Sequence, residues 1–207
     1  MDGGHVARGS LIVFEGLDGC GKSTQLDLLY EWLCERGVDC VKTREPTDGE
    51  WGRRIREMAR SGERVTPEEE LAWFVEDRRE HVREVIEPAL ARGAFVLSDR
   101  YWLSSVAYQG ARGLDAAAIQ RASEAEFPDP DLAIIFEVSP EEGIARVNAR
   151  GGVGEPVFEE VEFQRRVKKV FGQMDRPWIV RVDARGGVSE IHQAVLACVR
   201  ERGMVGD

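Results

Sequence analysis

The sequence predicts an α/β fold in which a five-stranded parallel sheet is covered by helices on both faces. Five short apolar segments alternate with segments of helical periodicity along the 207 residues, a pattern typical of parallel sheets. A Gly-x-x-x-x-Gly-Lys-Ser segment at residues 16–23 lies where the first apolar segment meets the first helical one, which is the context of a phosphate-binding loop. Charged residues also follow the first three strands, at the edge where such sheets bind ligands.

Each expected strand is a short run rich in Val, Ile, Leu or Phe. The first of them, Leu-Ile-Val-Phe-Glu, leads directly into the glycine-rich loop. The second is followed by Glu45-Pro46, where the proline favours an extended or turned chain. The expected strands are residues 11–15, 39–43, 94–98, 132–138 and 178–182.

The expected helices have apolar residues at helical spacing and recognisable end signals. Gly37 ends the first helix. Thr66, Pro67 and Glu69 form a capping box with proline at the first helical position, and Pro88 should kink this third helix or start a new turn. The expected helices are residues 22–36, 51–61, 66–92, 104–109, 115–127, 139–150, 158–174 and 188–202.

The composition indicates one soluble domain over residues 1–207, with 43% hydrophobic and 32% charged residues. No apolar run approaches the roughly 20 residues of a membrane span, and residues 1–10 lack the apolar stretch of a signal peptide, so we expect a cytoplasmic protein. The net charge of −10 disfavours general nucleic-acid binding. The four cysteines have no metal-ligand spacing and are expected to be reduced thiols.

The glycine-rich loop has the composition needed to wrap a phosphate chain. Its glycines remove the Cβ atoms that would keep backbone N–H groups from the phosphates, and the following helix directs its N-terminal dipole towards the anion. Lys22 is expected to reach the outer phosphates, and the Ser23 hydroxyl to bind Mg²⁺. The expected phosphate-binding residues are Gly16, Leu17, Asp18, Gly19, Cys20, Gly21, Lys22, Ser23 and Thr24.

Further candidate residues stand at the strand ends and on the third helix. Asp99 ends the third strand, where a Walker-B-type carboxylate belongs, and is expected in the Mg²⁺ shell, with helix capping as the alternative. Phe74 and Arg78 are four residues apart and share a helix face, although a phenylalanine on an apolar stripe is usually a core residue. His81 lies one turn beyond Arg78 and is expected at the surface or as a cap, with a supporting role behind Arg78 as the alternative. Glu68, Glu69 and Glu70 are expected only as helix N-terminal charges.

Five segments occur in the order and at the spacing found in thymidylate kinases, and nearly the whole chain resembles that family. The segments are Phe14 to Thr24, Thr43 to Pro46, Phe74-x-x-x-Arg78, Asp99-Arg100-Tyr101 and Ser104 to Gly110. The resemblance implies the P-loop nucleoside monophosphate kinase fold, a three-layer sandwich with strand order 2-3-1-4-5. It also implies transfer of the ATP γ-phosphoryl group to dTMP, which gives dTDP and ADP, with Mg²⁺ as cofactor and a homodimer as the assembly.

The resemblance also implies roles for residues of the acceptor site. Arg100 would hold the acceptor phosphate as a catalytic residue, with Arg44 facing the same crevice, and Asp18 would bind the 3′-hydroxyl of dTMP. Phe74 would stack on thymine, and Arg78 would hydrogen-bond its O4. Tyr108 would disfavour a 2′-hydroxyl. Further dTMP contacts are implied for Pro46, Ser105 and Gln109.

A mobile lid at about residues 146–160, which closes over ATP, is implied as well. One type within the family carries an arginine where this chain has Gly19, and loops without that arginine usually pair with a catalytic arginine from the lid. Many relatives have Asp-Arg-x-Glu where this chain reads Pro-Val-Phe-Glu at residues 156–159. Arg150 is therefore expected to supply the catalytic charge, with Arg146 as the alternative and as an ATP contact. If neither supplies it, turnover is expected to be reduced.

The implied acceptor is a phosphate oxygen, which is largely ionised at neutral pH, so the chemistry calls for cations and not for a general base. One alternative is another nucleotide or deoxynucleoside kinase of the same fold, in which Asp18 would act as base towards a hydroxyl acceptor. The segments around Phe74 and Tyr108 argue against it. A second alternative is a non-catalytic nucleotide-binding switch, but the guanine-reading Asn-Lys-x-Asp tetrapeptide does not occur in the sequence.

Overall fold

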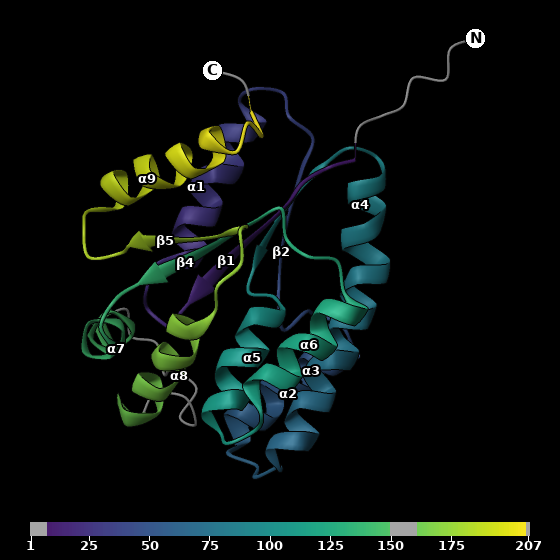
Figure 1. Ribbon diagram of the computed structural model, residues 1–207, viewed down its shortest axis with the longest axis vertical. Helices are drawn as coiled ribbons and strands as arrows, with labels where there is room; N and C mark the ends of the chain where they lie inside the picture. The colour runs from purple at the N-terminus through teal and green to yellow at the C-terminus, as the bar shows by residue number, and fades with distance from the viewer. Residues whose placement is uncertain (1–7, 150–160, 206–207) are drawn as a thin grey trace.

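The five apolar segments form one parallel sheet in the order β2-β3-β1-β4-β5 (Figure 1). The computed structural model that shows this sheet describes residues 8–149 and 161–205. Strand β1, at the centre of the sheet, is buried along its whole length. The predicted α/β fold and strand order are therefore confirmed. The strands are β1 (Leu11–Gly16), β2 (Cys40–Arg44), β3 (Phe95–Asp99), β4 (Leu132–Glu137) and β5 (Ile179–Asp183).

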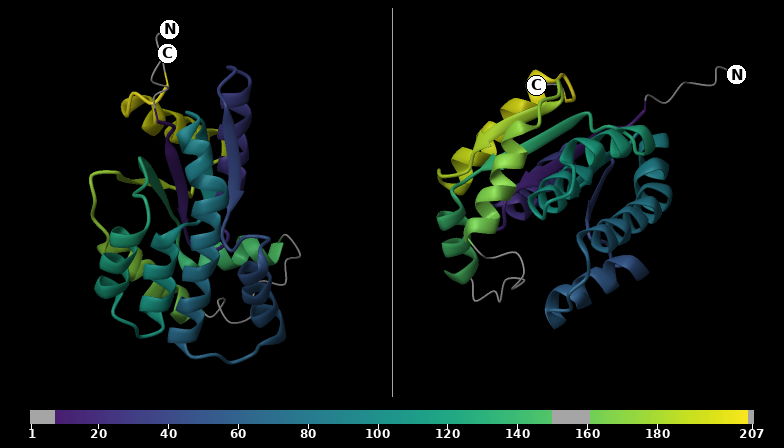
Figure 2. Two further views of the ribbon diagram at one scale, coloured as in Figure 1. Left: turned by 90° about the vertical axis from the view of Figure 1, so that its right-hand side faces the viewer. Right: turned by 60° about the horizontal axis from the view of Figure 1, so that its bottom comes forward.

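Helices connect the strands and enclose the sheet as two outer layers (Figures 1 and 2). Helices α1 and α9 pack against each other on one face, whereas α4, α5 and α8 cover the other. Within the described residues, none of the helices combines the length and apolarity needed to cross a bilayer. The helices are α1 (Lys22–Cys34), α2 (Glu50–Ser61), α3 (Pro67–His81), α4 (Glu87–Ala91), α5 (Trp102–Ala111), α6 (Ala116–Glu126), α7 (Pro140–Ala149), α8 (Val161–Gln173) and α9 (Val188–Glu201), with the π-helix η1 (Val82–Ile86) between α3 and α4.

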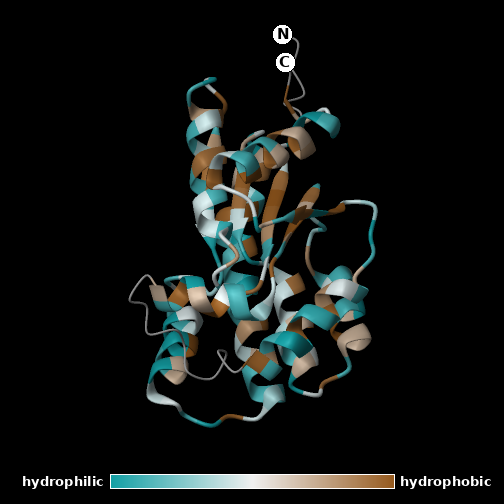
Figure 3. Cartoon of the chain, turned by 90° about the vertical axis from the view of Figure 1, so that its left-hand side faces the viewer, coloured by the Kyte–Doolittle hydropathy of each residue, from teal (hydrophilic) through white to brown (hydrophobic). Residues whose placement is uncertain are grey.

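The apolar side chains concentrate where the helices meet the sheet. In Figure 3 the strands are predominantly hydrophobic, while the helices alternate between hydrophobic and hydrophilic residues. Phe14 of β1 and Phe136 of β4 stack at a centroid distance of 5.9 Å inside this core. Because apolar surface on both faces of the sheet is removed from water, the sheet is a rigid support for the loops at its carboxyl edge.

The third predicted helix, over residues 66–92, is not a single α-helix. Its start is as expected, since Thr66 and Glu69 form the capping box, but α3 gives way to η1 at Val82. The physical reason lies at Pro88. Proline has no N–H, and its ring clashes with the carbonyl four residues earlier. A widened π turn just before it accommodates that ring, and α4 then continues to Ala91.

The topology brings the ends of three strands to one place. Register pairs Asp99 of β3 with Phe14 of β1 on one side and with Arg44 of β2 on the other. The segments that follow these strands therefore leave the sheet side by side, and they contain most of the candidate site residues.

Candidate active site

The glycine-rich loop joins β1 to α1, as predicted. Gly16, Gly19 and Gly21 have φ values of 134°, 77° and 98°, a region that residues with a Cβ rarely adopt. Lys22 is 6% exposed, and its Nζ donates to the carbonyls of Gly16 at 3.2 Å and Leu17 at 2.9 Å. The lysine thus lies across the loop, with its charge held where a phosphate chain would be wrapped.

The same loop lies directly against the start of α7. A Cβ on Gly19 would come within 2.1 Å of the Gly143 carbonyl oxygen, and a Cβ on Gly143 within 2.5 Å of the Asp18 carbonyl oxygen. Neither position has room for a side chain. The two backbones are consequently in contact, and α7 supports the loop from the β4 side of the sheet.

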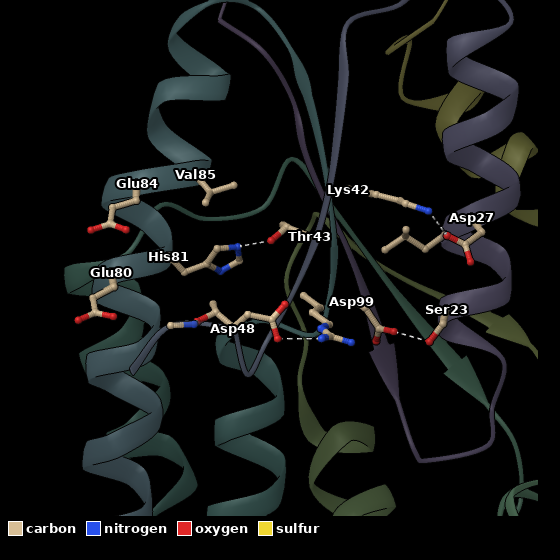
Figure 4. Close-up of a pocket in the computed structure, with 14 residues that line it drawn as sticks. Ser23, Asp27, Lys42, Thr43, Asp48, Glu80, His81, Glu84, Val85 and Asp99 are labelled. Carbon is tan, nitrogen blue, oxygen red and sulfur yellow. Dashed lines mark hydrogen bonds and ion pairs between the residues drawn. The ribbon is translucent and has the colours of Figure 1, made fainter. Parts of the chain in front are cut away.

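Ser23 and Asp99 lie together, as expected for a magnesium site. The Ser23 Oγ donates to Asp99 Oδ2 at 2.5 Å, between the first turn of α1 and the end of β3 (Figure 4). A hydroxyl and a carboxylate are hard oxygen donors of the kind that Mg²⁺ prefers. The donor set of this chain therefore fits the ion.

Arg100 stands at the centre of a second cluster next to the loop. It is the non-glycine residue with a positive φ, 74°, in the described chain, a conformation that tends to occur at functional sites. Its guanidinium donates to the Asp18 carboxylate, to Ser104 Oγ at 3.0 Å and to Tyr108 Oη at 3.2 Å. Burial alone would raise the pKa of Asp18, but the charges of Arg100 and Lys22 outweigh it and hold that pKa below its usual value. Asp18 is therefore an ionised acceptor.

Glu15 supports this cluster, although no motif in the sequence points to it. Although it lies within the apolar β1 and is fully buried, it accepts hydrogen bonds from the Tyr101 N–H at 2.8 Å and from Ser104 Oγ at 2.6 Å. It thereby holds the first turn of α5 and, through Ser104, the Arg100 guanidinium. The available signal was a carboxylate inside a strand whose other residues are apolar or glycine, because such a group needs partners.

We expect Glu15→Gln to change the pH dependence of stability. Burial raises the pKa of Glu15 to about 7, against the hydrogen bond from Ser104 and the charge of Arg100. The folded state therefore binds a proton more tightly than the unfolded state, so this contribution to stability is full below pH 4.5 and is lost as pH rises through 7. The unfolding free energy of wild type relative to Glu15→Gln should fall by about 2 kcal/mol between roughly pH 5.5 and 8.

Urea unfolding at both pH values measures this difference. Glu35→Gln, at an exposed position after α1, is the matched control and should keep the wild-type pH profile. Parallel profiles for wild type and Glu15→Gln would contradict the prediction.

Arg78 forms a third cluster, deep between α3, α5 and the segment after β2. It is 1% exposed. Its Nε and Nη2 donate to Glu45 Oε2 at 2.9 and 2.6 Å, and Nη2 also donates to Ser105 Oγ at 3.0 Å. Its Nη1 has no hydrogen-bond partner among the described residues. A buried N–H without a partner is costly, so this nitrogen is suited to an acceptor on a ligand.

Phe74 lies one helical turn before Arg78 and is half-buried. Its neighbours Leu71 and Val75 pack against the hydrophobic core, whereas Phe74 is outside that cluster. The ring is therefore not a core residue, the alternative that its place on an apolar stripe had left open.

Two expectations about α3 are wrong. His81 is 2% exposed, because the helix turns this face towards the end of β2, where His81 contacts Thr43 and Glu45. Glu70 is fully buried and accepts from Arg112 at the end of α5, so it is more than a first-turn charge. In both cases the packing of a neighbouring element, which helix periodicity does not reveal, buries the side chain.

A cavity of about 560 Å³ opens between α1, β2 and the α3–η1 segment (Figure 4). Ser23, Arg44 and Asp99 all line it, so the structure brings these three predicted residues together. Arg44 is exposed and pairs with Asp48 at 2.9 Å. Carboxylates also stand on the facing walls: Asp27 is on α1, and Glu80 lies across the cavity on α3.

The remaining predicted residues are spread more widely. Pro46 is half-buried, and its carbonyl accepts from Arg56. Gln109 is buried beside Glu70, and Glu70 lies about two helical turns from Arg78 along α3. Arg146 donates to the Ala184 carbonyl at 2.8 Å, after β5. Arg150 and the Pro-Val-Phe-Glu segment at 156–159 lie outside the described residues, so most of the predicted lid does too.

The glycine-rich loop is suited to wrap a phosphate chain, and a second site that contains arginine lies one strand away. This is the arrangement of a P-loop kinase that phosphorylates an anionic acceptor. The sequence model of the family described as Thymidylate kinase matches residues 14–195. The chain therefore belongs to the thymidylate kinase family, whose members are ATP-dependent nucleoside monophosphate kinases.

Individual relatives agree with this assignment. The chain is 45% identical to a thymidylate kinase of Akkermansia muciniphila over 184 residues, covering 89% of this chain and 88% of the relative. It is 40% identical to a thymidylate kinase of Desulfotalea psychrophila over 194 residues, covering 93% and 95%. A probable thymidylate kinase of Pyrococcus abyssi is 42% identical over 202 residues, covering 93% and 97%.

Proposed function

We propose that the protein transfers the γ-phosphoryl group of ATP to the phosphate of dTMP, giving dTDP and ADP. The observation that carries the choice of thymine is the buried Arg78, whose Nη1 has no partner among the described residues and lies one turn from the half-buried Phe74. A base that stacks on Phe74 and presents a carbonyl oxygen to Nη1 satisfies both. Membership of the thymidylate kinase family supports the same substrate.

The catalytic task is to bring two anions together without a general base. Loop N–H groups and Lys22 bind the donor phosphates, while Arg100 and Arg44 bind the acceptor phosphate. Ser23 and Asp99 would hold Mg²⁺, which neutralises phosphate charge when bound. The positive charges of Lys22 and Arg100 both act on Asp18, so they stand close enough to act on two adjoining phosphates.

Recognition of the nucleoside uses the walls of the same site. Asp18, ionised beside Arg100, accepts from the 3′-hydroxyl of dTMP. Tyr108, held by Arg100 and in contact with the Phe163 ring at a centroid distance of 6.1 Å, closes the deoxyribose side and disfavours a 2′-hydroxyl. Pro46, Ser105 and Gln109 complete the dTMP contacts.

A coupled ADP-release assay with Mg-ATP tests the function across dTMP, dUMP, UMP, dCMP, dGMP, AMP and thymidine. We expect dTMP to have the highest kcat/KM, with dUMP lower by about fivefold because one methyl contact is worth about 1 kcal/mol. A ribonucleotide or a nucleoside as the preferred acceptor would refute the proposal. ATP binding without transfer to any monophosphate would favour a nucleotide-dependent switch.

The proposal extends to the surroundings of the site. Arg150 supplies the lid charge that Gly19 does not provide, with Arg146 as an ATP contact on the same helix. The whole chain acts as a single kinase domain located in the cytoplasm, and it works as a homodimer, as the family resemblance implies.

A further inference from the structure

Behind the Arg78 cluster lies a histidine that the proposed reaction does not use. The His81 side chain is 1% exposed. Its Nδ1 lies 2.9 Å from Glu45 Oε1, and its Nε2 lies 2.7 Å from Thr43 Oγ1 (Figure 4). The imidazole therefore bridges the end of β2 and the segment that follows it, from a position on α3 about one turn beyond Arg78.

The partners fix which ring nitrogen carries the hydrogen. Burial alone would raise the pKa of Glu45, but the charge of Arg78 and the hydrogen bond from His81 outweigh it and keep that pKa below its usual value. An ionised carboxylate only accepts hydrogen bonds. Nδ1 of His81 is consequently the donor to Glu45, and in the neutral ring Nε2 accepts from the Thr43 hydroxyl.

Glu45 divides its two oxygens between its neighbours. Oε1 accepts from His81, and Oε2 accepts from both Nε and Nη2 of Arg78. With one oxygen held by the histidine, the carboxylate plane is fixed, and the guanidinium bound to the other oxygen is fixed with it. Ser105 Oγ holds Nη2 from the α5 side. The orientation of the unpartnered Nη1 thus depends on a chain of contacts that begins at Thr43 and His81.

We propose that His81 is a positioning residue for base selection. Through Glu45 it orients Arg78 so that Nη1 donates a hydrogen bond to pyrimidines with a carbonyl at position 4 and disfavours those with an amino group there. The proposal rests on the proposed function, in which Nη1 meets the base. A 4-amino group would place N–H donors against N–H donors, and an unmatched buried donor is a strong source of discrimination. Without the contact between His81 and Glu45, the guanidinium of Arg78 would be less firmly oriented, and this discrimination between the two bases would be lost.

The test compares kcat/KM for dTMP and dCMP in wild type, His81→Leu and His81→Asn. Leucine fills a similar volume without a donor, whereas the asparagine amide N–H₂ occupies about the place of Nδ1 and can still donate to Glu45. We expect His81→Leu to lower the dTMP-to-dCMP ratio by about tenfold or more, mainly through a higher KM for dTMP. His81→Asn should keep most of the ratio.

His192 on α9 is the matched control, because it is a half-buried histidine away from this cluster, and His192→Leu should leave the ratio unchanged. A purely structural role for His81 would lower both kcat/KM values equally, and an unchanged ratio in His81→Leu would overturn the inference. If His81→Leu does not fold, Thr43→Val removes only the outer contact and should lower the ratio by about two- to fivefold; no change there would overturn the inference equally. A wild-type protein that does not prefer dTMP would instead refute the proposed function.

Discussion

Replacement of Arg100 by methionine is expected to lower kcat/KM for dTMP by about 10³-fold or more. Arg100 forms an ion pair with Asp18 and contacts Ser104 and Tyr108 as well, so its loss would remove the charge that we propose holds the acceptor phosphate. It also leaves the Asp18 carboxylate without its ion-pair partner, but that side chain is 42% exposed, so solvent screening keeps the cost to stability small. Steady-state kinetics with dTMP varied at saturating ATP measures the effect.

Two variants separate charge from packing at this position. Arg100→Lys keeps the positive charge but not the planar guanidinium that can donate two parallel hydrogen bonds. It should therefore recover part of the activity lost in Arg100→Met. Arg83→Met, at an exposed arginine of η1 that pairs with Glu84, should leave kcat/KM unchanged. A loss smaller than tenfold in Arg100→Met would contradict the role assigned to this residue.

Replacement of Lys22 by methionine is expected to lower kcat by about 10³-fold, with a folded protein. Its Nζ is held by two backbone carbonyls of the loop, so the ammonium group is already placed beside the site of the outer phosphates. Because charge on the transferred phosphoryl group must be neutralised in the transition state, the loss should appear in kcat at saturating ATP and dTMP. Lys169→Met, at an exposed position on α8, is the control with the same change.

The two losses are distinguishable because, in the proposed function, Lys22 binds the donor phosphates and Arg100 binds the acceptor phosphate. Arg100→Met should raise the KM for dTMP, while Lys22→Met should leave that KM near the wild-type value. Thermal unfolding of both variants within a few degrees of wild type would show that folding is intact. A kcat within tenfold of wild type for Lys22→Met would show that Lys22 is not a catalytic residue.

The sequence predicts the scaffold well because strand composition and glycine spacing are local properties. The five strands, the capping box at Thr66 and the pairing of Ser23 with Asp99 follow from runs of a few residues and from the rule that parallel strands end together. The structure also places Asp18, Arg100 and Tyr108 in one cluster.

What the sequence does not predict is the second layer of contacts behind the site. Glu15 and Glu45 are partners chosen by tertiary packing, and their separation in the chain carries no periodic signal. The place of His81 one turn beyond Arg78 indicates a supporting role only as an alternative to a surface position. Glu15 lies in a segment that is otherwise apolar apart from Gly16, so the hydrophobic pattern hides it. The π turn at Val82 is similarly invisible, because proline indicates a break in the helix but not the form that the break takes.

The contact between Gly19 and Gly143 bears on how such loops diverge. Position 19 does more than lack an arginine side chain. Its backbone touches the carbonyl of a residue more than a hundred positions away. A chain of this kind cannot acquire an arginine at position 19 by one substitution, because α7 would first have to move away from the loop. Among relatives that keep this close approach, the residues at the two positions should therefore covary, and the two loop types should be separated by at least two coordinated changes.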